Sequence, residues 1–447
     1  MAEFDVIVIG TGSGGTSVAS KCASAGKKVA VIDSLPFGGT CALRGCDPKK
    51  VLVGITHALD LSERLRHKGV KTPASLSWED MMRFKRTFTE PVPSRKEKSL
   101  HKKDITTYHG RARFTSENTL EINGETLRAD KFVLANGAKP MKLSIPGEEL
   151  VIDSTDFLDL EELPDDILLI GGGYIAFEFG HLAARMGAKV KIIQRGERPL
   201  KNFDADLVNN LVKATQELGV EVILNTEVKG IAKENGKLIV RATSAGKEIS
   251  FSTSLAVHAA GRVADIEDLQ LEKVNVSHGR RGVKVNEYMQ SVSNPNVYAS
   301  GDVNDKGLPL TPVAGKEGLV AASNLLKGNH KKIEYGHIPS NVFTIPALAA
   351  VGLTEQEAQR QGLNYKVKTE ETTGWFSSRR LNEPISAYKV LLDKETDQIL
   401  GAHLLGPHAE EVINIFAVAM NAKVKGSELK KMIFSYPTNA SDIVYMV

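Results

Sequence analysis

The sequence is poor in cysteine, and this scarcity argues against one large class of proteins. Only three cysteines occur among 447 residues, and all of them lie within the first 46 positions. A secreted protein held together by a disulfide framework needs several cysteine pairs along its chain. The sequence therefore predicts no such framework.

Long apolar runs and an excess of charge of one sign are missing as well. No apolar stretch approaches the ~20 residues that a membrane-spanning helix needs. The formal net charge is only +3, with lysine and arginine spread along the chain, which argues against nucleic-acid binding. The start, MAEFDVIVIG, enters a predicted strand at once and leaves no room for a signal peptide. We expect a cytoplasmic enzyme of about three domains, from the usual length of a domain.

The sequence does contain two dinucleotide-binding units. The first runs from the strand FDVIVI through Gly10, Gly12 and Gly15 into a helix over 16–25 and a second strand that ends on Asp33. Glycines in such a turn let a pyrophosphate approach the amides of the helix N-terminus, and the terminal acid holds a ribose. Strand, turn, helix and acid agree, so a dinucleotide site is predicted here.

The second unit lies over 165–204. Gly171 and Gly173 occupy its turn, and Ala176 takes the third small position, where the helix packs closely on its strand. The second strand ends on Gln194 where an acid would accept a ribose hydroxyl. Three cations follow this glutamine: Arg195, Arg198 and Lys201. Cations attract a 2′-phosphate and no carboxylate repels it, so the pattern favours NADPH over NADH.

Two of the cysteines lie between these units. Cys41 and Cys46 belong to the segment GGTCALRGCDPKK, over 38–50, with four residues between them. On one turn of the next helix the two thiols can close into a redox disulfide, and the helix N-terminus lowers the pKa of the leading thiol. Two cysteines on a helix can also be inert core residues, and the spacing alone does not decide. Cys22 lies on a small, apolar helix face and is predicted to be a core thiol.

Four further segments share a pattern with the cysteine segment: LANGAKP (134–140), AAGRVAD (259–265), VYASGDV (297–303) and LTPVAGKEG (310–318). Together they resemble the class I pyridine nucleotide-disulfide oxidoreductases, which include glutathione reductase, dihydrolipoamide dehydrogenase and mercuric reductase. The resemblance covers nearly the whole chain. It implies an α/β fold with two Rossmann-like domains, which bind FAD and NADPH, and a C-terminal α+β domain that pairs two chains into a homodimer. The implied boundaries are 1–150 and 264–333 for the FAD domain, 151–263 for the NADPH domain and 334–447 for the dimerisation domain.

The resemblance also implies roles for single residues. Cys46 is expected to be the sulfur nearer the flavin and Cys41 the exchange thiol, while Lys49 is expected to pair with Glu178 near flavin N5. FAD is expected to contact residues from several segments: Gly10, Gly12, Gly14, Gly15, Asp33, Gly39, Thr40, Lys50, Asn136, Gly137, Asp302, Thr311, Pro312, Val313 and Ala314. The expected NADPH site comprises Gly171, Gly173, Tyr174, Ile175, Glu178, Arg195, Arg198, Lys201 and Gly261. No metal site is expected.

The chain departs from the family near its C-terminus. The disulfide reductases carry a His-Pro-Thr run whose histidine, oriented by a glutamate, is the acid and base of thiol exchange. Here Tyr436 stands in place of that histidine, and Ser441 stands in place of the glutamate, followed by Asp442. A tyrosine has an ordinary pKa near ~10 and is a poor base at neutral pH, which argues against rapid turnover of glutathione or lipoamide disulfide. Whether Tyr436, Tyr445 or Asp442 takes part in proton transfer stays open.

Smaller departures surround the cysteines and the histidines. Arg44 adds positive charge that favours a thiolate, whereas Asp47, directly after Cys46, works against one. Three histidines are possible substitute bases, although each is better interpreted as a surface or interface residue: His337, His403 and His408. The basic stretch SRKEKSLHKKD, over 94–104, is interpreted as a solvated helix face, with a cationic rim for an anionic substrate as the alternative.

The sequence thus predicts an enzyme that passes electrons from NADPH through FAD to a Cys41–Cys46 disulfide and on to a disulfide substrate. Metal-ion or quinone reduction is an alternative, because mercuric reductases also carry a tyrosine where this chain has Tyr436. Their C-terminal cysteine pair is missing, however, since no cysteine follows Cys46. A diaphorase or NADPH oxidase that does not use the cysteines, and a non-catalytic redox sensor, are further alternatives. The physiological electron acceptor is not predicted.

Overall fold

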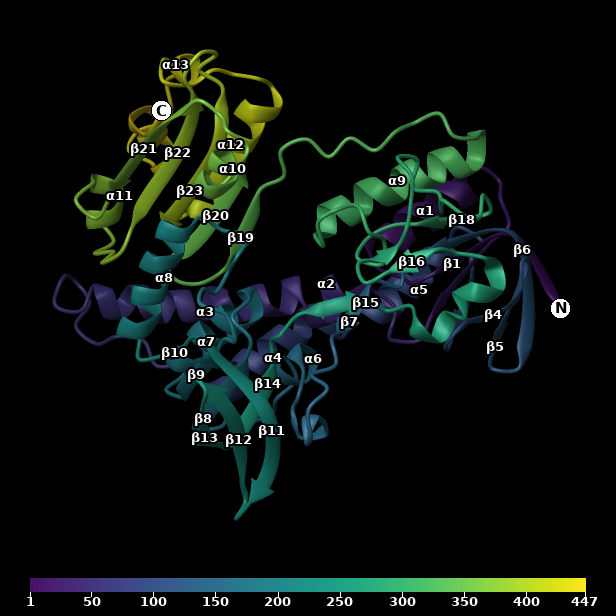
Figure 1. Ribbon diagram of the computed structural model, residues 1–447, viewed down its shortest axis with the longest axis horizontal. Coiled ribbons are helices and arrows are strands. Elements are labelled where there is room, and N and C mark those ends of the chain that lie inside the picture. The colour runs from purple at the N-terminus through teal and green to yellow at the C-terminus, as the bar shows by residue number, and fades with distance from the viewer. The chain divides into compact units, whose positions relative to one another are not determined.

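All residues of the chain, 1–447, are described by a computed structural model (Figure 1). The chain folds into two compact units, each assembled from three separate stretches. The first unit consists of residues 1–49, 84–141 and 261–335, and the second of residues 50–83, 142–260 and 336–447. The boundaries of the three domains stay a prediction, since the structure assigns 50–83 and 142–150 to the second unit. None of the helices has both the length and the apolar character that a membrane span requires.

A seven-stranded sheet forms the centre of the first unit, in the order β3-β2-β1-β6-β5-β4, with β18 paired to β6. The strands are β1 (Ala2–Ile9), β2 (Val29–Asp33), β3 (Thr106–His109), β4 (Arg113–Ser116), β5 (Thr119–Ile122), β6 (Glu125–Leu134) and β18 (Val297–Ala299). The pairs among β3, β2, β1, β6 and β18 are parallel. Parallel strands covered on both faces are apolar throughout, which explains the run VIVI of β1, all of it buried.

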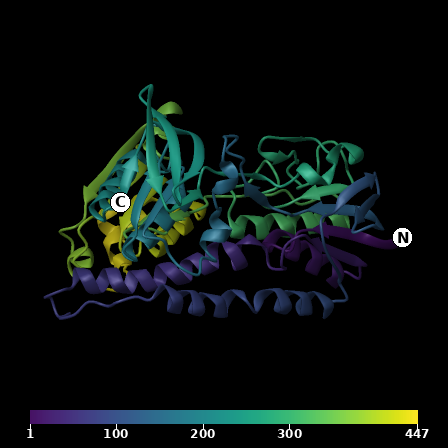
Figure 2. The same cartoon turned by 90° about the horizontal axis from the view of Figure 1, so that it is seen from below.

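Two helices lie side by side against this sheet, α1 (Ser13–Ser24) and α9 (Thr311–Lys327), as Figures 1 and 2 show. Glycine permits their close approach, because a Cβ at Gly318 would lie 2.4 Å from the carbonyl oxygen of Gly14. The unit also contains α2 (Gly39–Arg44), the start of α3 (Cys46–Arg64), the end of α4 (Trp78–Thr89), α5 (Val92–His101), β7 (Ala138–Pro140), β15 (Arg262–Ala264), β16 (His278–Gly279) and β17 (Gly282–Val283). The basic stretch 94–104 lies on and after α5, and most of its side chains are exposed.

The second unit repeats the strand-turn-helix-strand pattern. Its four-stranded parallel sheet has the order β10-β9-β8-β14. The elements around it are α6 (Ser154–Phe157), β8 (Asp166–Ile170), α7 (Tyr174–Arg185), β9 (Lys189–Ile193), α8 (Ala205–Glu217), β10 (Glu221–Ile223) and β14 (Leu255–His258). An antiparallel sheet accompanies it, formed by β11 (Thr226–Glu234), β12 (Lys237–Ser244) and β13 (Lys247–Thr253).

The C-terminal part of the second unit is a five-stranded antiparallel sheet in the order β19-β20-β23-β22-β21. Its strands are β19 (Ser340–Val342), β20 (Ala347–Gly352), β21 (Tyr365–Glu371), β22 (Ala387–Asp393) and β23 (Ile399–Gly406). The helices of this part are α10 (Glu355–Arg360), α11 (Phe376–Arg379), α12 (Ala409–Asn421), α13 (Gly426–Leu429) and α14 (Ile443–Met446). Helix α12 buries Ile413 and Phe416. The predicted α/β fold, with two dinucleotide-binding units and a C-terminal α+β part, is confirmed.

Candidate functional site

The turn between β1 and α1 brings three backbone segments into contact. A Cβ at Gly10 would lie 2.2 Å from the carbonyl oxygen of Ala135, and one at Gly39 would lie 2.5 Å from the Cα of Gly12. Gly10 and Gly39 also have positive φ angles, of 109° and 76°, which favour glycine. Glycine at these positions therefore lets three backbone segments approach closely at the N-terminus of α1, the kind of backbone surface on which a pyrophosphate binds.

Asp33 ends β2 as predicted, and its carboxylate fastens the same turn. Oδ2 accepts hydrogen bonds from the backbone N–H of Thr11 at 2.8 Å and from its hydroxyl at 2.6 Å, and Oδ1 accepts from the N–H of Leu35 at 3.0 Å. The Thr11 hydroxyl in turn accepts from the N–H of Gly38 at 2.9 Å. Thr11 was missed by the sequence analysis, and its signal is a hydroxyl residue between two glycines of the turn.

Two buried polar atoms without partners lie near the turn between β1 and α1. Asn136 donates its amide to the carbonyl oxygen of Asp265, but its Oδ1 is buried and unpaired, as is the hydroxyl of Ser300. Burial raises the pKa of Asp302, although Arg262 opposes this rise. Native proteins rarely leave such atoms unpaired, so their presence beside the glycine turn indicates a polar ligand. These residues fit the FAD that the sequence predicts, and Ser300 and Arg262 add to the predicted set.

The N-terminus of α9 lies at the cysteines. The helix begins at Thr311 and Pro312, and no side chain caps its first amides. The Thr311 hydroxyl lies 3.7 Å from Sγ of Cys46, within hydrogen-bonding distance of a sulfur. The positive end of a helix stabilises negative charge nearby. The structure therefore brings together a predicted flavin-facing residue and the sulfur predicted to be nearer the flavin.

The two cysteines lie on two helices, not on one turn of a single helix as the sequence analysis expected. Helix α2 ends at Arg44, Gly45 takes an extended φ of −146°, and α3 begins at Cys46. Both residues are free thiols, Cys46 exposed and Cys41 half-buried. Glycine at position 45 separates the helices, so each thiol belongs to the first turn of its own helix.

The thiolate is favoured at Cys46 and disfavoured at Cys41, whereas the prediction placed the lowered pKa at the leading thiol, Cys41. The neighbouring Cys41 thiol lowers the pKa of Cys46 to about 6, with further help from Thr311 and Lys49. The Cys46 sulfur, together with burial, raises the pKa of Cys41. The expectation of a lowered pKa at the leading thiol is therefore wrong, because Cys46 holds the thiolate. The opposing effect predicted for Asp47 is confirmed at both sulfurs.

Cys22 is a core thiol, as predicted. Its side chain is fully buried on α1, and burial raises its pKa to about 11. A thiol of this kind remains protonated and takes no part in exchange.

The second dinucleotide unit has the same backbone geometry as the first. A Cβ at Gly171 would lie 2.2 Å from the carbonyl oxygen of Ala259, and Gly173 precedes the first residue of α7, Tyr174. Glu178, one turn further, is buried, and its Oε1 accepts the backbone N–H of Phe343 at 2.8 Å. The pairing of Lys49 with Glu178 stays a prediction.

Three cations predicted for the NADPH site have different surroundings. Arg198 donates to the carbonyl oxygens of Lys201 at 3.0 Å and Phe203 at 3.4 Å, so it fastens its own loop. Lys201 is exposed, and its Nζ would lie 3.4 Å from a Cβ at Gly196, next to Nε2 of Gln194 at 3.1 Å. Arg195 is also exposed. The loop therefore presents an amide and a cation side by side, as recognition of a phosphate requires.

Lys50, a predicted FAD ligand, has its contacts in the second unit. Its ammonium group is 4.0 Å from the centre of the Phe343 ring and 3.7 Å from Oε1 of Glu410, within the second unit. Thr40, by contrast, is the second residue of α2, directly before Cys41.

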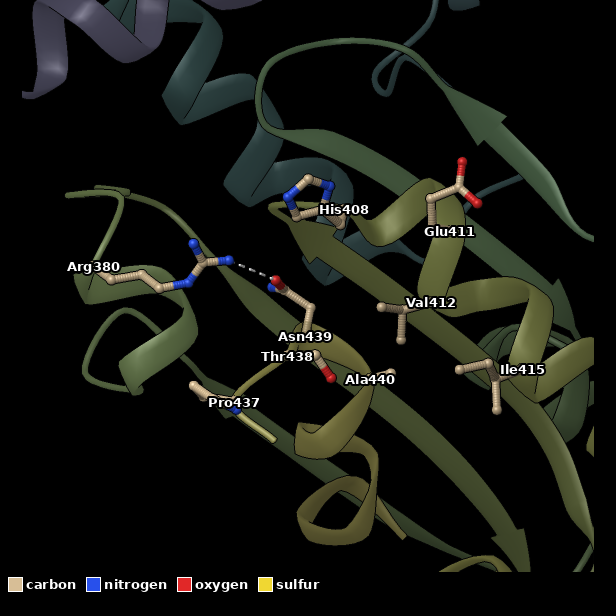
Figure 3. Close-up of a pocket in the computed structure, with 9 residues that line it drawn as sticks. All are labelled: Arg380, His408, Glu411, Val412, Ile415, Pro437, Thr438, Asn439 and Ala440. Carbon is tan, nitrogen blue, oxygen red and sulfur yellow. Dashed lines mark hydrogen bonds between the residues drawn. The ribbon is translucent and has the colours of Figure 1, made fainter. Parts of the chain in front are cut away.

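The C-terminal segment presents Tyr436 to solvent, with 79 % of its surface exposed. Asp442 accepts the hydroxyl of Ser377, and burial raises its pKa. Tyr445 packs edge-on against Trp375. Beside this segment is a pocket of about 330 Å³ (Figure 3), lined by Arg380, His408, Glu411, Val412, Ile415, Pro437, Thr438, Asn439 and Ala440.

The three histidines differ in exposure. His337 and His408 are exposed, and His408 lines the pocket of Figure 3. His403 is 1 % exposed, and its Nε2 contacts the carbonyl oxygen of Leu353 at 3.0 Å. The interpretation of His403 as a surface or interface residue is therefore wrong, because β23 has a strand on either side.

Comparison with known proteins agrees with this geometry. A family model described as pyridine nucleotide-disulphide oxidoreductase matches residues 4–318, and the model of its dimerisation domain matches residues 338–447. A glutathione reductase of Burkholderia cepacia is 31 % identical over 444 residues, which cover 99 % of this chain and 98 % of that protein.

Two further relatives differ in extent and kind. An uncharacterised 19.7 kDa protein of the mercuric resistance operon of Staphylococcus aureus is 56 % identical over 180 residues, which are 40 % of this chain and all of that protein. The Cu(II) complex of RclA from Escherichia coli, an HOCl-induced flavoprotein disulfide reductase, superimposes with a TM-score of 0.89 at 27 % identity and covers 100 % of this chain and 99 % of RclA.

Proposed function

Because the chain belongs to the pyridine nucleotide-disulphide oxidoreductase family and is a flavin-dependent disulfide oxidoreductase that uses FAD and NAD(P)H, we propose that it transfers electrons from NADPH to a disulfide through Cys41 and Cys46. The observation that carries this proposal is the unequal pair of thiols at the N-terminus of α9. Cys46 is held as a thiolate beside the Thr311 hydroxyl, while Cys41 keeps its proton.

The residues around the pair have separate tasks. Bound FAD would supply the chemistry that links hydride transfer from a nicotinamide to reduction of a disulfide, with Cys46 as the sulfur expected to be nearer to it. Thr311 and the amides at the start of α9 stabilise the negative charge at Cys46. Cys41 is the thiol that attacks the substrate, and Cys46 then displaces the product by attack on Cys41.

NADPH is the proposed electron donor, in preference to NADH. Gln194 stands where a carboxylate would repel a 2′-phosphate, and the side chains of Gln194 and Lys201 lie close together at Gly196. Arg198 contributes indirectly, since it holds the loop that carries Lys201.

A homodimer is proposed as the working form in the cytoplasm. The C-terminal part matches a dimerisation domain, and it carries Tyr436 on an exposed segment. Reduction of a metal ion is a second candidate function. It is supported by the relative from a mercuric resistance operon and by the tyrosine in place of the family's histidine.

Replacement of Cys41 by serine tests the proposed function. We expect C41S to lose nearly all NADPH-dependent reduction of disulfides, because it removes the thiol that attacks the substrate and the partner that Cys46 needs to form a disulfide. The measurement is anaerobic titration with NADPH, followed by flavin absorbance, and then turnover with a panel of disulfides, Hg²⁺, Cu²⁺ and quinones. The wild-type enzyme should take up two electron pairs per flavin and C41S only one.

C22A is the matched control, since it removes the buried thiol and should change neither the titration nor the turnover. Full turnover of disulfides by C41S would contradict the proposed function and favour a diaphorase. A Cys41-dependent reduction of metal ions without any reduction of disulfides would favour the second candidate.

A further inference from the structure

Two unusual residues of the chain, Tyr436 and Asp47, concern the thiol proton of Cys41. The exchange thiol must lose a proton before it can attack a disulfide, and the family's histidine, which would accept that proton, is replaced by Tyr436. Directly after Cys46 the chain carries an acid, Asp47, which the proposed function does not use. The structure places this acid beside the exchange thiol, since Sγ of Cys41 donates to Oδ1 of Asp47 at 3.8 Å.

We propose that Asp47 is a catalytic residue that accepts the proton of Cys41 during thiol exchange and so replaces the missing histidine. This inference rests on the proposed reduction of disulfides. The carboxylate belongs to the first turn of α3 and is exposed, so a substrate that reaches Cys41 also reaches Asp47.

The steps balance in protons and electrons. In the reduced enzyme, Cys46 is a thiolate and Cys41 a thiol. As the Cys41 sulfur attacks one sulfur of the substrate disulfide, its proton passes to Asp47, the substrate S–S bond breaks and the first thiolate leaves. Asp47 then returns the proton to that leaving thiolate. Attack of the Cys46 thiolate on Cys41 releases the second thiolate and restores the Cys41–Cys46 disulfide, so that two electrons have moved to the substrate.

The surroundings show why Cys41 needs a local proton acceptor. Lys49 and the Thr311 hydroxyl stabilise the thiolate of Cys46, and the neighbouring Cys46 together with burial raises the pKa of Cys41. Both sulfurs and Asp47 form one small cluster, in which the carboxylate is the acceptor that can leave the Cys46 thiolate free. A thiol with a raised pKa also gives a more nucleophilic thiolate once its proton is removed.

The charge of Asp47 has the opposite effect on thiol exchange from its proposed role as a base, and the two effects can therefore be told apart. Negative charge near the sulfurs disfavours both thiolates. If Asp47 acted only through its charge, Asp47→Asn would increase the thiolate population and raise the rate of exchange near neutral pH. If Asp47 accepts the proton, the same substitution lowers that rate.

The experiment compares D47N with the wild-type holoenzyme, with 5,5′-dithiobis(2-nitrobenzoate) and glutathione disulfide as the probes. We expect kcat/KM of D47N near neutral pH to fall about 100-fold, the lower end of the range for loss of a general base. The deficit should shrink as pH rises, because hydroxide then removes the proton of Cys41. D47E should recover part of the activity.

Two controls separate the possible results. E63Q neutralises another exposed acid on α3, one that pairs with Arg66, and should leave kcat/KM unchanged. Reduction of D47N by NADPH, followed by flavin absorbance, should proceed as in the wild type, since that half of the reaction does not involve the Cys41 proton.

Equal or faster exchange by D47N would overturn the role of Asp47 and leave the proposed function standing. A fall of kcat/KM in Y436F, with kcat/KM unchanged in D47N, would likewise overturn the role of Asp47 and would assign the proton transfer to Tyr436. Absence of any Cys41-dependent disulfide reduction in the wild-type enzyme would overturn both the proposed function and this inference.

Discussion

Neighbouring residues give the two thiols of the site different pKa values. Cys46 stands at the first position of α3, beside Thr311 and Lys49, and these neighbours favour its thiolate. Cys41 stands in the first turn of a six-residue helix, and its pKa is raised by Cys46 and by burial. The pair therefore holds one proton between two sulfurs at neutral pH, so the order of attack is set before a substrate arrives.

The thiolate of Cys46 should be lost only in acid. Its pKa of about 6 lies below the ordinary value of 9.0, so the thiolate is present above that pH and disappears as the pH falls through about 6. The measurement is ultraviolet thiolate absorbance of the reduced enzyme against pH. K49M should raise the pKa of Cys46, because it removes a nearby cation.

The neighbouring variant K50M is the control, since the ammonium of Lys50 lies at Phe343 and Glu410. A thiolate transition of the wild-type enzyme near pH 9.0, the ordinary thiol value, would contradict the assignment.

The sequence was sufficient to locate most residues of the first turn. Gly10, Gly12, Gly15 and Asp33 follow a spacing that few other structures require, and the structure places all four at one turn. The pKa order of the cysteines could not be predicted, because it depends on a helix break at Gly45 and on Thr311, which is 265 residues away from Cys46 along the chain.

Among the elements, α9 links the cysteine site with the loop that carries Asp302. Glu317 on this helix is 1 % exposed. Its carboxylate accepts the N–H of Gly301 at 2.6 Å, the amide of Asn304 at 2.7 Å and the hydroxyl of Tyr335 at 2.7 Å. One acid therefore holds both sides of the Asp302 loop against the helix.

Replacement of Glu317 by leucine should destabilise the first unit and weaken the retention of FAD. The substitution leaves three donors without an acceptor, and each buried donor left unpaired costs about 1–3 kcal/mol. Thermal unfolding and the flavin content of the purified protein measure the effect. E317Q should lose less stability and less FAD than E317L. Its amide oxygen can accept from Gly301 and Asn304, while its NH₂ group donates to the Tyr335 hydroxyl. Equal flavin content in E317L and the wild type would contradict this role.

Helices and strands of the two dinucleotide units were predictable because their apolar periods are strong. The environment of His403 was not, since a histidine in a short apolar run has the same local pattern on an edge strand as on a central one. It is buried on a central strand, paired with β20 and β22, with Asp204, Lys389 and Glu357 nearby. Glu317 escaped prediction for a similar reason, since all three of its partners lie outside its own helix.

At the scale of the whole molecule, the C-terminal part leaves large apolar side chains in solvent. Ile433 is fully exposed, Val418 is 68 % exposed and Tyr436 is 79 % exposed. An exposed apolar surface of this kind is typical of a site where a partner binds. A match to a dimerisation domain over 338–447 makes a second copy of this chain the expected partner.

I433D should therefore shift the protein from dimer to monomer, because it places a charge where an apolar contact is expected. Light scattering during size-exclusion chromatography measures the change. V292D is the control, as it alters an exposed valine of the first unit, outside the dimerisation domain. A dimer of unchanged strength in I433D would exclude Ile433 from the interface.

The hydrogen bonds of Arg198 bear on attempts to redesign the coenzyme preference. Its guanidinium donates to two backbone carbonyls of the loop over 198–203, so it supports the loop in addition to any contact with a coenzyme. A library that randomised every cation of this loop would therefore also remove these two hydrogen bonds. A library restricted to positions 194, 195 and 201 would keep the hydrogen bonds of Arg198 and would vary only side chains that are proposed to contact the coenzyme.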